Sequence, residues 1–387
     1  MSGADATPDR PTAPAGLVEA LAALKAWLVR DAYPLWAGLG PDRDHGGWHD
    51  QLDLAGVPVA GPRRARVQAR QAWTFAQAPR FGWDGDWRGA MRRGLDVLDH
   101  RFRRPDGLYR GLVPAAGQPS DEAELYDQAF VLLALAAACQ AGEPGADVAA
   151  ERLLGQLAPH PGGGFKELSG PALLANPNMH LFEAFLAWSE IGGGTVWQAL
   201  ADRQAQLAHS RLIDHDTGAL SEDFGPDWTV PDDPAQRRVE PGHQFEWAWL
   251  LLKWRHSAGR AQDLRLALHL IGLAEQCGVD RVRGVAVNEL DGDLEARDLS
   301  ARLWPQTERL KANVAAAAVT DAAACWDAAE SAARAILRYL DVPRRGLWRD
   351  RLDAAGDFVE EPVPASTFYH LVLAIRELDA AVGTPGA

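Results

Sequence analysis

Residues 238–254 read RVEPGHQFEWAWLLLKW, a turn followed by a helix that is apolar on nearly every side. Pro241 and Gly242 form a turn dipeptide, and a proline disfavours the helical conformation for the residue before it. From His243 onward, phenylalanine, tryptophan and leucine fill most positions, which is typical of a buried helix. The imidazole of His243 therefore stands at the start of an interior helix, with Glu246 one turn further on the same face. Taken alone, such a histidine can equally be a core or capping residue.

Eleven further helices are predicted around this one. Apolar or amphipathic runs at helical spacing, separated by loops rich in Gly, Pro and Asp, predict helices at residues 17–36, 64–79, 87–103, 121–141, 147–157, 178–191, 195–210, 243–256, 261–277, 306–319, 321–340 and 364–382. No buried strands alternate with these helices, which argues against a doubly wound sheet or a TIM barrel. Twelve helices in sequential antiparallel pairs can close into a ring, with the more apolar six inside. The helix count, without any strict sequence repeat, therefore predicts an all-α (α/α)6 barrel with short β-hairpins in its long loops.

Composition excludes several classes of function. The 387 residues carry a formal net charge of −14, so no basic excess is present to neutralise nucleic-acid phosphates. No apolar run approaches the roughly 20 residues of a membrane helix, and the N-terminus lacks the features of a signal peptide. The cysteines at 139, 277 and 325 form no CxxC pair and no disulfide framework, which suits a reducing cytoplasm. We expect a disordered tail at residues 1–15, one barrel domain at 16–382, a monomer or homodimer, and no nucleic-acid or membrane partner.

Chemistry-bearing side chains recur near the predicted helix starts. Three histidines, His180, His243 and His370, lie on apolar helices, each near a helix start or a turn. Aromatic, amide, basic and acidic residues stand at comparable places: Arg70, Tyr126, Asn176, Trp304, Glu246 and Glu308. Each alone could serve the core, as most of the 15 tryptophans must. Together they form the mixture that a small-sugar site needs, because aromatic faces stack on sugar C–H surfaces while Arg, Asn and Glu bind hydroxyls.

Metal and nucleotide sites find little support. His180 and Glu183 form HxxE, and Glu240 and His243 form ExxH, but the second spacing spans Pro241-Gly242, which should spoil its helical geometry. HExxH and the Cys/His spacings of zinc sites are absent. The phosphate-binding patterns GxGxxG after a strand and GxxxxGK[ST], and the hydrolase pattern GxSxG, are absent too. We therefore expect no metal and no cofactor.

Six motifs, in this order, resemble the N-acylglucosamine 2-epimerase superfamily, which includes cellobiose 2-epimerases, mannose isomerases and sulfoquinovose-type aldose–ketose isomerases. The motifs are ARQAWTF (69–75), YDQAF (126–130), NPNMHLFEA (176–184), PGHQFEWAWLL (241–251), WPQTE (304–308) and the late Tyr369-His370. The resemblance runs from about residue 46 to residue 374, most of the chain. It implies an (α/α)6 barrel, which agrees with the helix count.

The resemblance also implies metal-independent proton transfer at C2 of a reducing sugar. His243 and His370 look like the two acid/base residues, and Arg70 looks like the group that stabilises an enediolate. The remaining residues look like substrate ligands, a stacking platform and carboxylates that tune the histidines: Tyr126, Asn176, His180, Trp304, Glu246 and Glu308. We expect His370 to take the C2 proton, with return to C1 giving a ketose and return to C2 from His243 giving an epimer. The resemblance favours the isomerase, interconverting D-mannose and D-fructose.

Several alternatives stay open. A 2-epimerase of the mannose/glucose or cellobiose type would use the same residues, and the sequence does not report pocket size. Phosphosugars are less favoured because no clear phosphate cradle is visible, although arginines could supply one. A sugar-binding protein would keep the tryptophans without needing His370. A glycoside hydrolase would need two carboxylates across the scissile bond, drawn from Asp127, Glu183, Glu246 and Glu308.

Overall fold

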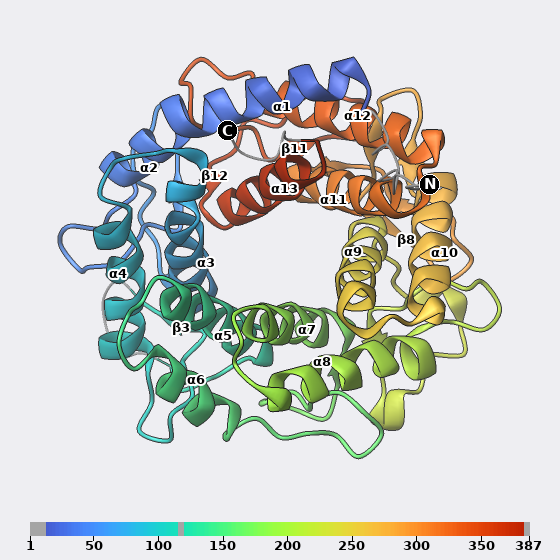
Figure 1. The fold of residues 1–387 in the computed structure, drawn as a ribbon, viewed down its shortest axis with the longest axis horizontal. Coiled ribbons are helices and arrows are strands. Elements are labelled where there is room, and N and C mark those ends of the chain that lie inside the picture. The colour runs from blue at the N-terminus through green and yellow to red at the C-terminus, as the bar shows by residue number, and fades with distance from the viewer. Residues whose placement is uncertain (1–12, 115–119, 383–387) are drawn as a thin grey trace, which may run out of the picture.

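Helices dominate the structure, a computed structural model that describes residues 13–114 and 120–382. In this part of the chain six inner helices surround the centre of a ring (Figure 1): α3 (Ala65–Ala76), α5 (Leu125–Gln140), α7 (Ala175–Glu190), α9 (Pro241–Ala258), α11 (Leu303–Thr320) and α13 (Ser366–Val382). Six outer helical units alternate with them along the chain: α1 (Ala15–Trp27) continued by α2 (Tyr33–Leu39), then α4 (Trp87–Val97), α6 (Ala146–Leu154), α8 (Thr195–Leu207), α10 (Ala261–Cys277) and α12 (Ala323–Tyr339). The predicted (α/α)6 barrel is confirmed.

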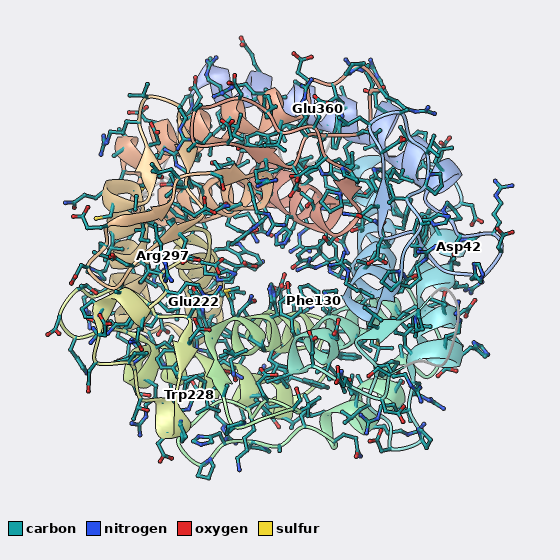
Figure 2. All side chains as sticks on the ribbon, turned by 180° about the vertical axis from the view of Figure 1, so that it is seen from behind. Asp42, Phe130, Glu222, Trp228, Arg297 and Glu360 are labelled. Atoms are coloured by element: carbon teal, nitrogen blue, oxygen red, sulfur yellow. The ribbon has the colours of Figure 1, made fainter. Side chains whose placement is uncertain are left out.

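The two layers differ in how they bury their side chains. Inner helix α5 is buried on every side, nearly without a break from Leu125 to Ala138. Outer helix α4 buries a single stripe, which includes Met91 and Val97, and leaves its other faces to solvent. Seen from behind, Phe130 of α5 lies toward the centre of the ring and Glu360 toward its edge (Figure 2). For these two helices, the more apolar sequence takes the inner position, as predicted.

Short antiparallel strands tie neighbouring loops together. Four ladders join the strand before one inner helix to a strand of another loop: β2 (Arg63–Arg64) with β3 (Leu112–Val113), β4 (Leu173–Leu174) with β5 (Asp223–Phe224), β10 (Ala301–Arg302) with β11 (Arg351–Leu352), and β12 (Val363–Pro364) with β1 (Gln51–Leu52). The remaining two ladders are hairpins within one loop: β6 (Val279–Asp280) with β7 (Val285–Ala286), and β8 (Glu289–Leu290) with β9 (Ala296–Asp298). Short hairpins were predicted in the long loops, and two of the ladders in the described residues are hairpins. The other four join separate loops and were not predicted, because a strand of two residues carries no sequence signal for a distant partner.

The ladder of β1 with β12 closes the ring. It joins the loop before the first inner helix to the strand before the last one, while α13 packs on α3 and α1 packs on α12 and α13. Lys25 of α1 adds an ion pair of 2.9 Å with Asp379 of α13. Of the tail predicted at 1–15, residues 1–12 lie outside the described residues, and α1 begins at Ala15. No helix in the described ranges is long and apolar enough to cross a membrane.

Helix α9 begins two residues earlier than predicted. Pro241 and Gly242 form its first turn, and Glu240 precedes it in an extended conformation with φ −99° and ψ 115°. Proline suits this place, because the first helical position needs no backbone N–H donor. The expectation that Pro241-Gly242 would spoil the Glu240–His243 geometry was wrong: the two side chains meet at 3.5 Å.

A repeated side-chain contact holds the inner helices to their loops. On α3, the amide of Gln68 accepts from the backbone N–H of Trp48 at 2.7 Å and donates to its carbonyl at 2.9 Å. The same two bonds recur between Gln128 and Tyr109, Asn178 and Phe165, Gln244 and Leu220, and Gln306 and Ala286. We call these five contacts the amide clamps. Each fixes the start of an inner helix to the loop that precedes that helix.

Candidate active site

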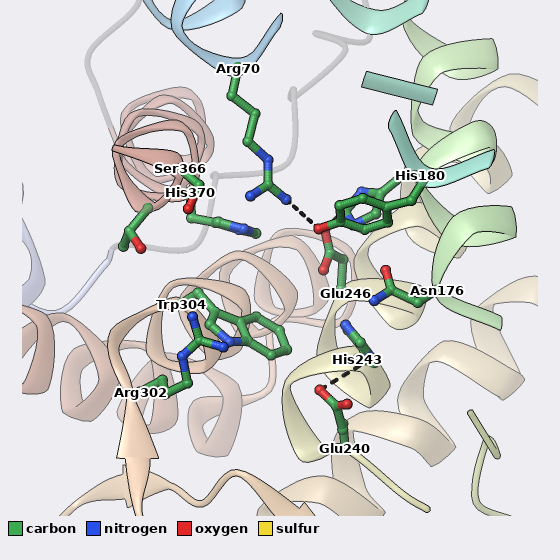
Figure 3. Close-up of a pocket in the computed structure, with 12 residues that line it drawn as sticks. Arg70, Asn176, His180, Glu240, His243, Glu246, Arg302, Trp304, Ser366 and His370 are labelled. Carbon is green, nitrogen blue, oxygen red and sulfur yellow. Dashed lines mark hydrogen bonds and ion pairs between the residues drawn. The ribbon is translucent and has the colours of Figure 1, made fainter. Parts of the chain in front are cut away.

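A pocket opens at the centre of the ring, where the inner helices begin (Figure 3). Residues four apart share a helix face, so Asn176 and His180 on α7 point into it together, as do Ser366 and His370 on α13. The cavity of about 200 Å³ is smaller than the roughly 300–1,000 Å³ of drug-sized sites. Every lining residue is polar or aromatic: Arg70, Tyr126, Asn176, His180, Glu240, His243, Glu246, Arg302, Trp304, Ser366, Thr367 and His370. Such a lining suits a small ligand rich in hydroxyl groups.

His243 is held in the charged form. Its Nδ1 atom lies 2.9 Å from Glu222 and 3.5 Å from Glu240. Burial alone would lower the pKa of His243, but the two carboxylates outweigh burial and raise the pKa to about 10. This imidazole is therefore an imidazolium at neutral pH and can donate a proton.

His370 is held in the neutral form. Its Nδ1 atom lies 2.8 Å from Glu308 Oε1, which leaves Nε2 for the pocket. Burial lowers the pKa of His370 well below its usual value, and the nearby cations of Arg70 and Lys311 lower it further. The indole of Trp304 lies near both histidines, with ring centroids 4.9 Å from His243 and 5.8 Å from His370. An acid and a base thus flank one aromatic platform.

Arg70 reaches into the pocket from α3. Its Nη2 atom donates to the Tyr126 hydroxyl at 2.7 Å, and its guanidinium lies 4.0 Å from the ring centroid of Phe130. The Nε atom is buried without a hydrogen-bond partner among the described residues. A cation held in this way can stabilise negative charge that develops on a bound ligand.

Asn176 and His180 supply neutral polar groups on the α7 side. The Oδ1 atom of Asn176 is buried and unpartnered among the residues described, so it is free to accept from a ligand hydroxyl. His180 Nδ1 lies 3.3 Å from Glu183, and burial lowers the pKa of His180 to about 4. Both side chains can therefore hydrogen-bond a sugar without adding charge.

Beneath the pocket lies a buried acidic layer. Glu183, Glu246 and Glu308 are each at most 5% exposed, and Lys311 among them is fully buried. Burial, together with neighbouring Glu308, raises the pKa of Glu246 well above its usual value. Tyr369 donates a hydrogen bond to Glu183 from α13. Every carboxylate of this layer is thus within reach of a pocket histidine or of Lys311.

The structure brings the predicted residues together. All of them line the pocket except Glu308, which lies one layer behind His370. The prediction missed Glu240, Arg302, Ser366 and Thr367 of the lining, and the partners Glu222 and Lys311. The ion pairs of His243 are made with Glu222 and Glu240, while Glu246 lies 3.9 Å from His180. Glu222 lies in the loop before α9, too far from His243 along the chain for helical spacing to reveal the pair.

Three clusters could in principle offer ligands to a metal ion. They are His180 with Glu183 and Glu246, Glu222 with Glu240 and His243, and Glu246 with Glu308 and His370, each with candidate ligand atoms within 4.8 Å of one another. The ammonium of Lys311, however, is paired with Glu308 and lies 4.0 Å from Glu246, and His243 is protonated at neutral pH. Two of the clusters therefore already contain a cation, and the absence of a metal stays a prediction.

Known proteins share both the sequence and the fold. A "Mannose-6-phosphate isomerase" of Rhizobium meliloti (strain 1021) is 46% identical over 370 residues, which cover 92% of this chain and 96% of the relative. Among solved structures, a D-mannose isomerase matches 94% of this chain and 98% of its own with a TM-score of 0.85 at 22% identity. The cellobiose 2-epimerase of Bacillus thermoamylovorans B4167 matches 93% and 99% with a TM-score of 0.82 at 17% identity.

The sequence also matches the model of a protein family. The model described as N-acylglucosamine 2-epimerase (GlcNAc 2-epimerase) matches residues 46–374, which span most of the chain and every residue of the pocket lining. This range agrees with the extent of the resemblance seen in the sequence motifs. The chain belongs to the N-acylglucosamine 2-epimerase family.

Proposed function

We propose that this protein is an aldose–ketose isomerase that interconverts D-mannose and D-fructose through a cis-enediolate without a metal. The observation that carries the proposal is the pair of histidines on either side of Trp304, His243 against Glu222 and His370 against Glu308. Their surroundings raise the pKa of His243 and lower the pKa of His370, which suits one to act as an acid and the other as a base. An isomerase needs one group that takes a proton from carbon and cationic groups that stabilise the resulting anion. Here the carboxylates mostly lie behind the histidines, which favours proton shuttling over glycoside hydrolysis.

The chemistry follows from these positions. His370 Nε2 takes the proton from C2 of the open-chain aldose, and the electron pair forms the C1–C2 double bond while charge moves onto O1. Arg70 stabilises this enediolate oxygen. His370 returns the proton to C1, the proton of O2 passes to O1, the O2–H electron pair forms the C2=O bond, and the ketose results. His243 serves as the acid that assists ring opening, and Asn176 and His180 hold sugar hydroxyls.

The 2-epimerase remains the alternative, and pocket size bears on it. Return of the proton to C2 from His243 would give the epimer with the same residues. A cavity of about 200 Å³ favours one sugar ring over two, which argues for a monosaccharide over cellobiose. Because an isomerase and an epimerase share the enediolate, product analysis has to separate them.

A phosphorylated substrate is the second candidate, and one side chain favours it. Arg302 lines the pocket at its mouth, and its side chain is 46% exposed, held by Asp350 at 3.4 Å. The relative from Rhizobium meliloti is named for mannose 6-phosphate. If the substrate carries a phosphate, Arg302→Met should raise KM for mannose 6-phosphate and leave KM for mannose unchanged.

Proton NMR of the EDTA-treated protein in D2O tests the proposal. Separate samples contain mannose, mannose 6-phosphate, fructose and cellobiose. Fructose from mannose, with deuterium at C1 of the fructose or at C2 of the recovered mannose, is the expected result. Glucose from mannose, or a mannose-ended disaccharide from cellobiose, would establish the epimerase. Turnover of mannose 6-phosphate alone would establish the phosphosugar. Loss of activity that added divalent metal restores would contradict the metal-free route.

We further propose that the protein acts in the cytoplasm as a monomer or a homodimer, with residues 16–382 working as one domain. The three cysteines are free in the structure, which suits a reducing compartment. Analytical ultracentrifugation of the full chain measures the oligomeric state, and a stable tetramer or larger species would contradict it.

A further inference from the structure

Lys311 is a buried lysine that does not line the pocket. It lies on α11, one turn after Glu308, and its side chain has no exposed surface. Its ammonium pairs with Glu308 Oε2, lies 4.0 Å from Glu246 Oε1 and sits 4.0 Å from the ring centroid of Trp249. Burying an ammonium group is costly unless it is paired with charge. A lysine in this place therefore calls for an explanation beyond packing.

The lysine forms one end of a chain of contacts that ends in the pocket. Glu308 holds Lys311 with one oxygen and His370 Nδ1, at 2.8 Å, with the other. Burial raises the pKa of Glu308, and Lys311 opposes this shift most strongly. Without the ammonium, a carboxylate in this layer would lie beside two others, Glu183 and Glu246, with less to balance its charge.

We propose that Lys311 is a positioning residue that keeps Glu308 ionised, so that Glu308 accepts the Nδ1 proton of His370 and leaves the Nε2 lone pair facing the substrate. The inference rests on the proposed function, because it concerns the base that takes the C2 proton. When Lys311 is removed, Glu308 takes up and keeps a proton, and its carboxyl O–H donates a hydrogen bond to Nδ1. The imidazole then carries its own proton on Nε2, and the base is blocked.

Other charged and titratable groups surround this contact chain and enter the same balance. They come from four inner helices: Arg70 of α3, His180 and Glu183 of α7, His243 and Glu246 of α9, and Tyr369 of α13. Arg70 and His243 stay cationic in the lysine variant. Their charges still partly balance those of the carboxylates. Lys311 is the cation that contacts Glu308 directly, so we expect its removal to change which nitrogen of His370 carries the proton.

Lys311→Met tests the proposal, because methionine keeps most of the length of the side chain and removes the charge. We expect kcat to fall about 10- to 100-fold, as for other groups that orient a reacting residue, with KM unchanged because Lys311 does not touch the pocket. Activity should recover in part as pH rises, because Glu308 then ionises again. In the Glu308→Gln background the same substitution should have little further effect on kcat.

Arg309→Met is the matched control. Arg309 is the neighbouring buried cation of α11, 4% exposed, but it pairs with Glu275 at 2.7 and 2.8 Å on the side away from the pocket. It should lower the melting temperature without changing kcat or the pH profile. Equal effects of the two substitutions on kcat would reduce Lys311 to a structural role and overturn the proposal.

The tautomer of His370 can be measured directly, which tests the role of Lys311 separately from the proposed reaction. Nitrogen-15 NMR of histidine-labelled protein, with His370 assigned from the His370→Gln difference, should show Nδ1 protonated in the wild type between pH 6 and 8. In Lys311→Met the proton should sit on Nε2. A wild-type Nε2–H tautomer would overturn the proposal even if the variant does not fold. If no sugar reacts but the tautomers behave as stated, the proposed function fails while the role of Lys311 stands.

Discussion

At the scale of the residue, two identical side chains are set to opposite tasks by their neighbours. His243 meets Glu222 and Glu240, which favour its charged form, whereas His370 is buried near Arg70 and Lys311, which favour its neutral form. Burial acts on both rings in the same direction, and each Nδ1 faces a carboxylate. The difference follows from the other neighbours, which are a second carboxylate, Glu240, beside His243 and cations near His370. The protonation states follow from charges that lie behind the pocket wall.

Glu222→Gln should move the alkaline limb of the pH–rate profile to lower pH. In the wild type the pKa of His243 is raised to about 10, so the proton of His243 is present through neutral pH and lost as pH rises through that value. Its stabilising contribution is complete below the unfolded pKa and is lost over the same rise. Removing the carboxylate at 2.9 Å lowers the pKa of His243. Activity measured from pH 6 to 11 checks this, and an unmoved alkaline limb would assign it to another group.

His370→Ala and His243→Ala should each lose at least about 100-fold in kcat, the lower end of what general acid–base catalysis contributes. The substitutions remove side chains that are 5% exposed, so circular dichroism and thermal unfolding have to accompany the kinetics. Turnover near the wild-type rate by either folded variant would remove that histidine from the mechanism.

At the scale of the element, the amide clamps position the inner helices. A glutamine or asparagine two residues before Arg70, Phe130, His180, Glu246 and Glu308 holds the backbone of the preceding loop by two hydrogen bonds. The last inner helix is held differently, by the Thr367 hydroxyl bonded to Asp350 at 2.8 Å. Every helix start that lines the pocket is therefore tied to a loop by buried polar contacts, which are specific in direction and distance.

Gln244→Leu should cost stability and activity together. It orphans the buried N–H and carbonyl of Leu220, at about 1–3 kcal/mol for each group. It also removes the two bonds that hold the loop of Glu222 to the helix of His243, so the ion pair between these residues should weaken. Gln128→Leu, which breaks the matching clamp on α5, should cost similar stability but lower kcat less, because α5 carries neither His243 nor His370. Denaturant unfolding and kinetics measure the two effects, and equal losses of kcat would contradict this assignment.

At the scale of the whole molecule, the ring makes one site out of distant parts of the chain. Its lining runs from Arg70 to His370 and is contributed by inner helices and loop ends of a single chain. The β1–β12 ladder and the packing of α13 on α3 bring the two ends of this span together. We therefore expect one subunit to be enough to form the pocket.

Specific activity should accordingly stay constant when the enzyme is diluted from micromolar to low nanomolar concentration. Any dimer that forms would dissociate over part of this range without removing a pocket residue. Progress curves at serial dilutions, with carrier protein to prevent adsorption, check this. A fall in specific activity that follows dissociation measured by ultracentrifugation would show that assembly completes the site.

The sequence by itself determined the helical layers and most of the pocket. Helical periodicity and the apolar runs around Trp247 and Leu132 require burial on all sides, which places α9 and α5 in the inner layer whatever their neighbours are. Arg70, His180, His243 and His370 stand near helix starts, and the N-terminal ends of inner helices meet at one mouth, so local pattern was enough to gather them.

Only the tertiary structure decided the protonation of the site. Glu222 reaches His243 from a loop, and Lys311 reaches His370 only through Glu308 of the neighbouring helix. The sequence likewise did not reveal the ladders between distant loops, such as β1 with β12. Periodicity reports which face of an element is buried, but the energy of a buried charge depends on what stands across from it. For His243 and His370 that partner comes in part from another loop or helix, Glu222 and Glu308, which the closure of the ring brings into contact.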